Sequence, residues 1–412
     1  MWSLGNEMWE GTGGYSAAYK TAQDNLVKWA QAADTTRPVT TGDNKLKGEE
    51  EGSITLANGL QEASGIHGMN YASGAEYDKI HKKYSEWPLY GSETASAVNS
   101  RGIYKGMNSQ HNYGNHDLTS YDTSAVGWGA TASSAWYEVI KRDFLAGEYV
   151  WTGFDYLGEP SPYDTDAWPS HSSLFGIIDL ASLPKDRYYL YRSLWNKNVN
   201  TLHILPHWTW PGREGENTPV FVYTNYPAAE LFVNGKSYGK QHKLTAEESK
   251  AIQDKDTLAL QRRYRLMWMD VPYEPGEVKV VAYDASGKPA EEKVVRTAGK
   301  PHHLEVIADR DQLTADGKDL AYITVRVVDK DGNLCPADNR LVNFTVKGAG
   351  RYRAAANGDA TSLDLFHLPK MPAFSGQLTA IVQMTEQPGE IIFEAKAKGV
   401  KSGKLVLRSV RE

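Results

Sequence analysis

The spacing of apolar residues changes near Trp195, and this change limits the folds that the chain can adopt. Before Trp195, short apolar runs alternate with amphipathic stretches of helical period, the pattern of strand–helix–strand units. After it, apolar residues recur at every second position, which is typical of half-buried strands. At roughly 100 to 200 residues per domain, a chain of 412 residues is expected to hold two to four domains.

The first part is predicted to contain five strands that alternate with helices, among them helices at 17–33, 75–84 and 131–146. Strands that alternate with helices form a parallel sheet, so their carboxyl ends should share one edge. The predicted ends are Glu7, Asn44, Tyr71, Glu93 and Trp151. Because a closed parallel barrel has eight strands, residues 1–198 are interpreted as strands 4 to 8 of a (β/α)8 barrel, with the first strands missing.

The second part is predicted to form two β-sandwiches. Asn234-Gly235 and the turn at 284–287 read as hairpin turns between short strands, which indicates a β-sandwich over residues 199–298. The Gly-Lys-Pro triplet at 299–301 marks a boundary. Alternating strands follow it, so residues 299–412 are predicted to form an immunoglobulin-like β-sandwich.

Composition excludes several classes of protein. The net charge is −6 with acidic and basic residues interleaved, so no basic surface for nucleic acid is expected. The single Cys335 rules out an internal disulfide framework and a four-cysteine zinc site. No apolar run approaches the roughly 20 residues of a membrane span, and any export signal would have to precede Met1.

Glu7 and Glu93 are the candidate catalytic residues. Cleavage of a glycosidic bond with retention needs two carboxyl groups about 5 to 5.5 Å apart, one as nucleophile and one as acid and base. Either glutamate alone is better explained as a solvated loop residue. Two glutamates at strand ends, each among aromatic and glycine residues, favour the catalytic interpretation.

Four more residues could line such a site. Asn6 can donate to a sugar hydroxyl, and Tyr71 can donate to an ionised carboxylate. Their alternative roles are a turn residue and a packed core ring. Trp151 and Trp128 could each form a stacking wall for a sugar, with core packing as the alternative, which is favoured more strongly for Trp128.

Other chemistries find little support. His111, His116 and Asp117 are candidate metal ligands by type, but their spacing matches no helical i, i+4 pair, so no metal is predicted. The first part lacks the Gly-x-Ser-x-Gly motif of a serine hydrolase. Gly11-Thr-Gly-Gly14 lacks both the P-loop lysine and the dinucleotide spacing, so no cofactor is expected.

Four segments resemble glycoside hydrolase family 2. Residues 1–7, MWSLGNE, resemble the acid/base motif of this family, and residues 90–96, YGSETAS, resemble its nucleophile motif. Residues 149–160 and 208–215 are similar to the bacterial β-galactosidases of the family that carry extra C-terminal sandwich domains. The resemblance implies that Glu7 is the acid/base and Glu93 the nucleophile.

The same resemblance implies roles for three further residues. Asn6 would contact the sugar 2-hydroxyl, Tyr71 would support the nucleophile, and Trp151 would form a wall of the site. The implied activity is that of a retaining exo-β-glycosidase without cofactors, acting on terminal β-galactosides. The implied location is periplasmic or extracellular.

The resemblance also implies that the chain is a C-terminal fragment. The open sheet should then be covered by the missing N-terminal part or by a second copy of the chain. β-Glucuronidases of the family use an Asn-x-Lys element, and the only such triplet is Asn234-Gly-Lys236 in a distal hairpin, which favours galactosides. A β-glucuronidase, or a noncatalytic carbohydrate-binding or scaffold fragment, is the alternative.

Overall fold

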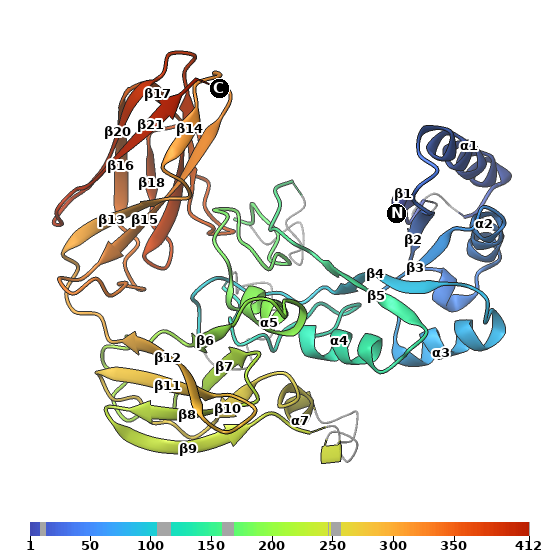
Figure 1. The fold of residues 1–412 in the computed structure, drawn as a ribbon, viewed down its shortest axis with the longest axis horizontal. Helices are drawn as coiled ribbons and strands as arrows, with labels where there is room; N and C mark the ends of the chain where they lie inside the picture. The colour runs from blue at the N-terminus through green and yellow to red at the C-terminus, as the bar shows by residue number, and fades with distance from the viewer. Residues whose placement is uncertain (9–13, 105–116, 159–168, 246, 249–256, 412) are drawn as a thin grey trace. The chain divides into compact units, whose positions relative to one another are not determined.

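The computed structural model describes residues 1–8, 14–104, 117–158, 169–245, 247–248 and 257–411. The chain divides into two compact units, coloured by residue number in Figure 1. Unit 1 comprises residues 1–97 and 124–153, and unit 2 comprises residues 98–123 and 154–412.

Unit 1 is built on a five-stranded parallel sheet in which the strands lie in chain order. The strands are β1 (Trp2–Asn6), β2 (Val39–Asp43), β3 (Ile66–Asn70), β4 (Leu89–Ala95) and β5 (Leu145–Trp151). The main helices between them are α1 (Ala17–Ala33), α2 (Glu51–Glu62), α3 (Gly74–Lys83) and α4 (Ala132–Ile140), with a short 3-10 turn at Leu46–Gly48. The predicted alternation of strands and helices is therefore correct for this unit.

Two details of the prediction are wrong. Helix α2 was not predicted, because Gly52, Ser53 and Gly59 interrupt its apolar pattern. The helix predicted over 131–146 ends at Ile140, and Leu145 already pairs with Leu89 in the sheet. Apolar residues continue from the helix into the strand, so their spacing alone does not locate this boundary.

Apolar side chains of the helices pack on the sheet of unit 1. One core cluster joins Tyr77 and Ile80 of α3 to Met69 and Leu89 of the strands. A smaller cluster joins Val27 of α1 to strand β2 and helix α2. The sheet is thus fixed from its helical side, and the carboxyl ends of its strands remain at one edge.

Unit 2 contains two pairs of sheets, each enclosing a hydrophobic core. In the first pair, sheet β10-β7-β6 faces sheet β12-β11-β8-β9 across a shared core. These strands are β6 (Leu202–Leu205), β7 (Val220–Thr224), β8 (Ala228–Val233), β9 (Lys236–His242), β10 (Leu266–Trp268), β11 (Glu277–Tyr283) and β12 (Pro289–Arg296). Asn234 and Gly235 both have positive φ in the β8–β9 turn, as the predicted hairpin requires.

The second pair consists of sheets β13-β15-β19-β17 and β14-β21-β20-β16-β18. The strands are β13 (His303–Ala308), β14 (Gln312–Thr314), β15 (Leu320–Val328), β16 (Leu341–Gly348), β17 (Gly350–Ala356), β18 (Lys370–Pro372), β19 (Gln377–Met384), β20 (Gly389–Ala397) and β21 (Gly403–Val410). Unit 2 also holds helices α5 (Asp186–Trp195) and α7 (Thr257–Gln261). The predicted change to a strand period after Trp195 is confirmed.

The carboxylate oxygens of Glu148 on β5 are buried in unit 1. A Cβ atom on Gly91 would lie 2.9 Å from the Tyr77 hydroxyl and 3.5 Å from the Cβ of Glu148, so these side chains meet beside β4. Burial raises the pKa of Glu148 from 4.5 to about 7, and the nearby Thr94 hydroxyl opposes this shift. Between about pH 4.5 and about pH 7, the folded protein therefore keeps a proton on Glu148 that the unfolded chain has already released.

Replacing Glu148 by Gln should remove a pH-dependent loss of stability. Because the pKa is higher in the folded state, the wild type should lose about 3 kcal/mol of unfolding free energy as the pH rises from about 4.5 to about 7. Urea unfolding at several pH values measures this loss, which should be smaller in Glu148→Gln. The exposed Glu62→Gln is the control, and parallel pH curves for Glu148→Gln and the wild type would contradict the prediction.

Candidate active site

The carboxyl ends of β1, β3 and β4 adopt an unusual backbone conformation. Glu7 follows β1 with φ of 45°, Tyr71 follows β3 with φ of 52°, and Ala95 ends β4 with φ of 64°. Non-glycine residues in this left-handed region cost on the order of 1–3 kcal/mol and cluster at functional sites. The strand ends predicted to carry chemistry are therefore also where unit 1 departs from regular strand geometry.

Asn70 connects three of these strands. Its Nδ2 donates to Oε1 of Glu7 at 2.8 Å and to Oδ1 of Asn6 at 2.9 Å. Its Oδ1 accepts from the hydroxyl of Ser92 at 2.5 Å. In this orientation Asn70 presents its N–H groups to Glu7 and Asn6 and its carbonyl oxygen to Ser92. The Glu7 carboxylate is therefore held by a fully buried amide.

Tyr71 holds the second carboxylate. Its hydroxyl donates to Oε2 of Glu93 at 2.6 Å, and its backbone N–H donates to the Glu93 carbonyl at 2.8 Å. Burial, followed by the hydrogen bond to Glu93, raises the pKa of Tyr71 well above its ordinary value. The phenol therefore stays protonated and acts as a donor to the Glu93 carboxylate.

The two carboxylates lie in one electrostatic environment. The negative charges of both Glu93 and Glu7 contribute to the raised pKa of Tyr71. Asn70 contacts Glu7 and neighbours Tyr71 in the chain, and it is paired with Glu93 in the register of β3 and β4. The structure thus brings Asn6, Glu7, Tyr71 and Glu93 together as a connected set of side chains.

Two tryptophans lie near this set. Trp151 ends β5 and is paired with Ala95, two residues after Glu93, and its peptide bond to Thr152 is cis. Trp128 is 57% exposed, so the core packing favoured for it from the sequence is wrong. It lines a cavity of about 260 Å³ that Tyr71 also lines. Neither Glu7 nor Glu93 lines this cavity, so a contact of either indole with a sugar stays a prediction.

Asn70 and Ser92 were missed from the sequence. Each directly precedes a predicted site residue, Tyr71 and Glu93 respectively, and this position at a strand end was the available signal. His111 and His116 lie outside the described residues. Within the part of the chain that the structure describes, no group of three or more His, Cys, Asp or Glu side chains could hold a metal ion. No described helix is both long and apolar enough to cross a membrane.

Family models match two segments of unit 2. The model named glycoside hydrolase family 2 C-terminal domain 5 matches residues 304–406. A model of a domain of unknown function matches residues 215–291.

Curated relatives match most of the chain. A β-galactosidase of Bacteroides ovatus is 38% identical over 394 residues, which is 92% of this chain and 42% of that protein. A putative β-glucuronidase of Formosa agariphila is 30% identical over 262 residues, or 62% of this chain and 23% of that protein. The chain therefore spans less than half the length of these relatives.

Solved structures of similar fold extend over the whole chain. A β-glycosidase from Bacteroides vulgatus gives a TM-score of 0.79 at 27% identity, covering 99% of this chain and 50% of that one. A family 2 glycosyl hydrolase from Bacteroides cellulosilyticus gives a TM-score of 0.76 at 25% identity, covering 100% of this chain and 49% of that one. The two units together thus match about half of each of these multidomain proteins.

Proposed function

Because the chain belongs to glycoside hydrolase family 2, we propose that it carries the catalytic carboxylates of a retaining exo-β-glycosidase that acts on terminal β-galactosides. The observation that carries this proposal is the pair of hydrogen bonds that orient the carboxylates, from Asn70 to Glu7 and from Tyr71 to Glu93. The identity of 38% to a β-galactosidase supports the choice of sugar.

In the proposed reaction, Glu93 attacks the anomeric carbon while Glu7 donates its proton to the departing glycosidic oxygen. A covalent ester between Glu93 and the sugar forms as the bond to the leaving group breaks. Glu7, now ionised, then takes a proton from water, and the resulting attack on the anomeric carbon releases Glu93 and the sugar. Both carboxylates end in their starting protonation states.

The neighbouring side chains fit supporting roles in this reaction. The Tyr71 hydroxyl donates to Glu93 and so favours its ionised, nucleophilic form. Because Oδ1 of Asn6 accepts from Asn70, the amide N–H groups of Asn6 are the ones suited to a sugar 2-hydroxyl. Trp151 would form a wall of the sugar site.

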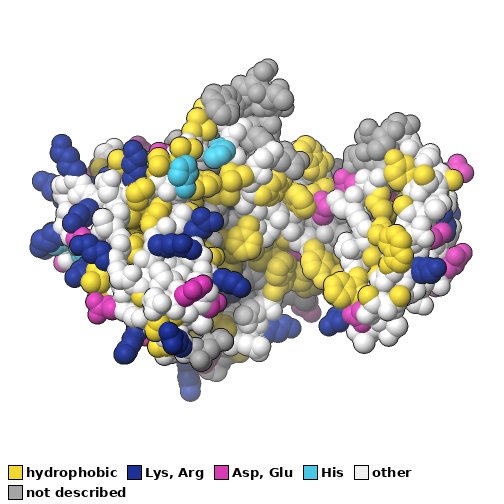
Figure 2. All heavy atoms as spheres, turned by 90° about the horizontal axis from the view of Figure 1, so that it is seen from above, with side chains coloured by type: hydrophobic (Ala, Val, Ile, Leu, Met, Phe, Trp, Pro, Cys, Tyr) yellow, Lys and Arg dark blue, Asp and Glu magenta, His cyan; other side chains and the backbone are white. Residues whose placement is uncertain are grey.

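We further propose that the sheet of unit 1 supplies strands 4 to 8 of a (β/α)8 barrel. The outer strands β1 and β5 carry the exposed aromatic residues Trp2 (46%) and Tyr149 (58%), and hydrophobic side chains are visible on this unit in Figure 2. We propose that further polypeptide covers these edges, either an N-terminal part such as the longer relatives could supply or a second copy of the chain.

The proposed domains are the barrel part at 1–198, a β-sandwich at 199–298 and an immunoglobulin-like sandwich at 299–412. The two enclosed cores of unit 2 support the sandwich assignments. We propose a periplasmic or extracellular location, as the resemblance to the family implies.

A β-glucuronidase is the second candidate, since one of the relatives is a putative β-glucuronidase. The Asn234-Gly-Lys236 triplet lies in the β8–β9 hairpin of unit 2 rather than at the strand ends of unit 1. This placement gives no support to a role in recognising the carboxylate of a glucuronide, so a galactoside remains the first choice.

The test uses a fusion that places the N-terminal part of the Bacteroides ovatus relative ahead of Met1. Nitrophenyl β-galactoside and β-glucuronide are supplied, and NMR follows the anomer released first. We expect turnover of the galactoside with release of β-galactose, as a double displacement requires. Release of α-galactose would contradict the retaining mechanism, and turnover of the glucuronide alone would replace the proposed sugar.

A further inference from the structure

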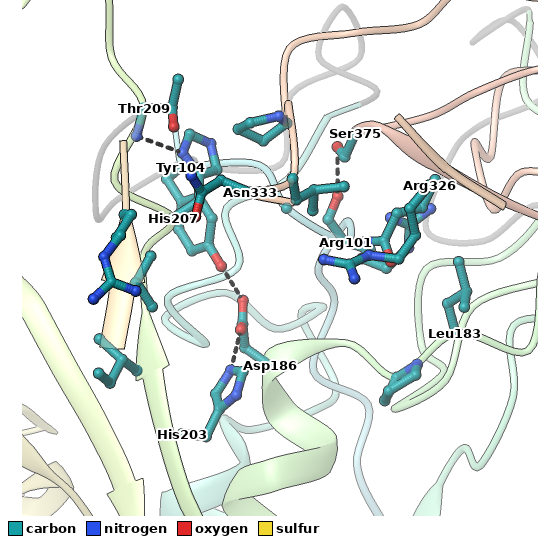
Figure 3. Close-up of a pocket in the computed structure, with 18 of the residues that line it drawn as sticks. Arg101, Tyr104, Leu183, Asp186, His203, His207, Thr209, Arg326, Asn333 and Ser375 are labelled. Atoms are coloured by element: carbon teal, nitrogen blue, oxygen red, sulfur yellow. Dashed lines mark hydrogen bonds and ion pairs between the residues drawn. The ribbon is translucent and has the colours of Figure 1, made fainter. Parts of the chain in front are cut away.

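A second cavity, separate in its residues from the carboxylate pair, lies within unit 2. Its volume is about 460 Å³, within the range of roughly 300–1,000 Å³ of small-molecule sites. Figure 3 shows side chains converging on it from separate parts of unit 2, including Arg101 and Tyr104, Asp186 at the start of α5, His203 on β6 and Arg326 on β15. The cavity is therefore formed only when these parts pack together.

The single acidic side chain that lines the cavity within the described residues is already engaged. Oδ2 of Asp186 accepts from the Tyr104 hydroxyl at 2.5 Å, and Oδ1 pairs with Nε2 of His203 at 2.6 Å. Both carboxylate oxygens thus have partners inside the protein, as the dashed lines in Figure 3 show. This acid is satisfied without a cationic ligand.

Three arginines line the same cavity: Arg101, Arg296 and Arg326. Nη2 of Arg296 donates to Glu277 at 2.6 Å, and Nη1 of Arg326 donates to Glu305 at 2.5 Å. Neither of these two glutamates lines the cavity. Because a guanidinium has five N–H groups, these single contacts leave Arg296 and Arg326 with further donors.

Arg101 is held more firmly. Its Nε donates to Asp179 at 2.5 Å, and its Nη2 donates to the carbonyls of Asn357 and Phe374. Its Nη1 is buried and has no hydrogen-bond partner among the described residues. The guanidinium of Arg101 is therefore fixed in the wall of the cavity, and Asp179 balances its charge.

The remaining walls suit a hydroxylated ring. Burial lowers the pKa of His207 to about 4, so this imidazole is neutral at pH 7 and can exchange hydrogen bonds without adding charge. Asn333 and Gln377 add amide groups. The Tyr189 ring, one face of which stacks on His203, adds apolar surface.

We propose that this cavity binds an acidic sugar, with a carboxylate or sulfate group at Arg326 and the ring hydroxyls at the amide and imidazole groups. Carboxylate and sulfate oxygens accept from guanidinium groups in the same way, and a neutral sugar lacks them. This binding site is a function in addition to the proposed hydrolysis and does not depend on it.

Calorimetric titration of the full chain tests the proposal, with galacturonate, galactose 6-sulfate, galactose and inorganic sulfate as probes. We expect at least one of the two acidic sugars to bind. The one that binds more tightly shows whether the site prefers a carboxylate or a sulfate. Galactose and inorganic sulfate should each bind at least about tenfold more weakly than that acidic sugar. No binding of either acidic sugar, or equal binding of galactose or of inorganic sulfate, would overturn the proposal.

Variants locate the binding. Arg326→Gln should weaken binding of the acidic sugar about tenfold or more, and Gln377→Ala, at the position paired with Arg326 in the sheet, provides a second test in case the first variant unfolds. Arg310→Gln is the matched control. Arg310 is also ion-paired, and it donates to the Leu320 carbonyl on β15, the strand that carries Arg326, but it does not line the cavity. Unchanged affinity in both test variants would overturn the proposal, as would loss of binding in Glu93→Gln, which would locate the sugar at the carboxylate pair.

Discussion

Replacing Glu93 by Gln is expected to reduce kcat for nitrophenyl β-galactoside by on the order of 10⁴-fold or more. The amide has nearly the same shape as the carboxylate, and its oxygen can still accept from the Tyr71 hydroxyl, which now lies 2.6 Å from Glu93. It cannot form the ester with the anomeric carbon. The variant should therefore fold normally and lose only the nucleophile.

Release of nitrophenol by the fusion measures this effect. The matched control is Glu86→Gln, an exposed glutamate seven positions earlier that precedes β4. We expect the control to keep the activity of the unchanged fusion. A Glu93→Gln variant with undiminished turnover would exclude Glu93 as the nucleophile.

Replacing Glu7 by Gln should give a loss that depends on the leaving group. With an unactivated galactoside, the departing oxygen needs the proton of Glu7, and activity should fall about 10²- to 10⁴-fold. With a dinitrophenyl galactoside, the leaving group departs as a stable anion, so formation of the glycosyl-enzyme should be far less affected. Asn70 contacts both Glu7 and Asn6, so the position of the variant side chain should be largely preserved.

Pre-steady-state measurement with both substrates separates this role from a structural one. An early burst of dinitrophenol followed by slow turnover is expected, because hydrolysis of the intermediate also needs Glu7 as base. An equal loss in the first step for both substrates would contradict acid catalysis by Glu7. Glu86→Gln again serves as the control.

The sequence predicted the parallel sheet and the position of the candidate site because both depend on short-range patterns. Five apolar runs separated by helices imply strand ends at one edge, and a glutamate at such an end is visible without a structure. Tyr71 was expected near the nucleophile from the family resemblance, and its hydroxyl contacts Glu93.

The hydrogen bonds that orient Glu7 could not be predicted in this way. Asn70 and Glu7 are 63 positions apart in the chain, and Asn70 also contacts Ser92 on a third strand. The exposure of Trp128 likewise depends on how its loop packs. Such features follow from tertiary contacts that the periodicity of a sequence does not encode.

The cavity in unit 2 could not be predicted from the sequence either. Arg101 and Arg326 belong to segments far apart in the chain, and neither lies in a recognisable motif. Only packing brings them to the walls of one cavity.

Trapping the covalent intermediate tests the central claim most directly. The fusion is incubated with 2-deoxy-2-fluoro-β-galactosyl fluoride, in which the fluorine at C2 slows both steps by disfavouring the oxocarbenium-like transition state, while the fluoride leaving group keeps formation faster than hydrolysis. Digestion and mass spectrometry then locate the sugar. We predict a fluorogalactosyl ester on the peptide that contains Glu93. An ester on Glu7, or no adduct in a fusion that hydrolyses galactosides, would contradict the proposed assignment of Glu93 as the nucleophile.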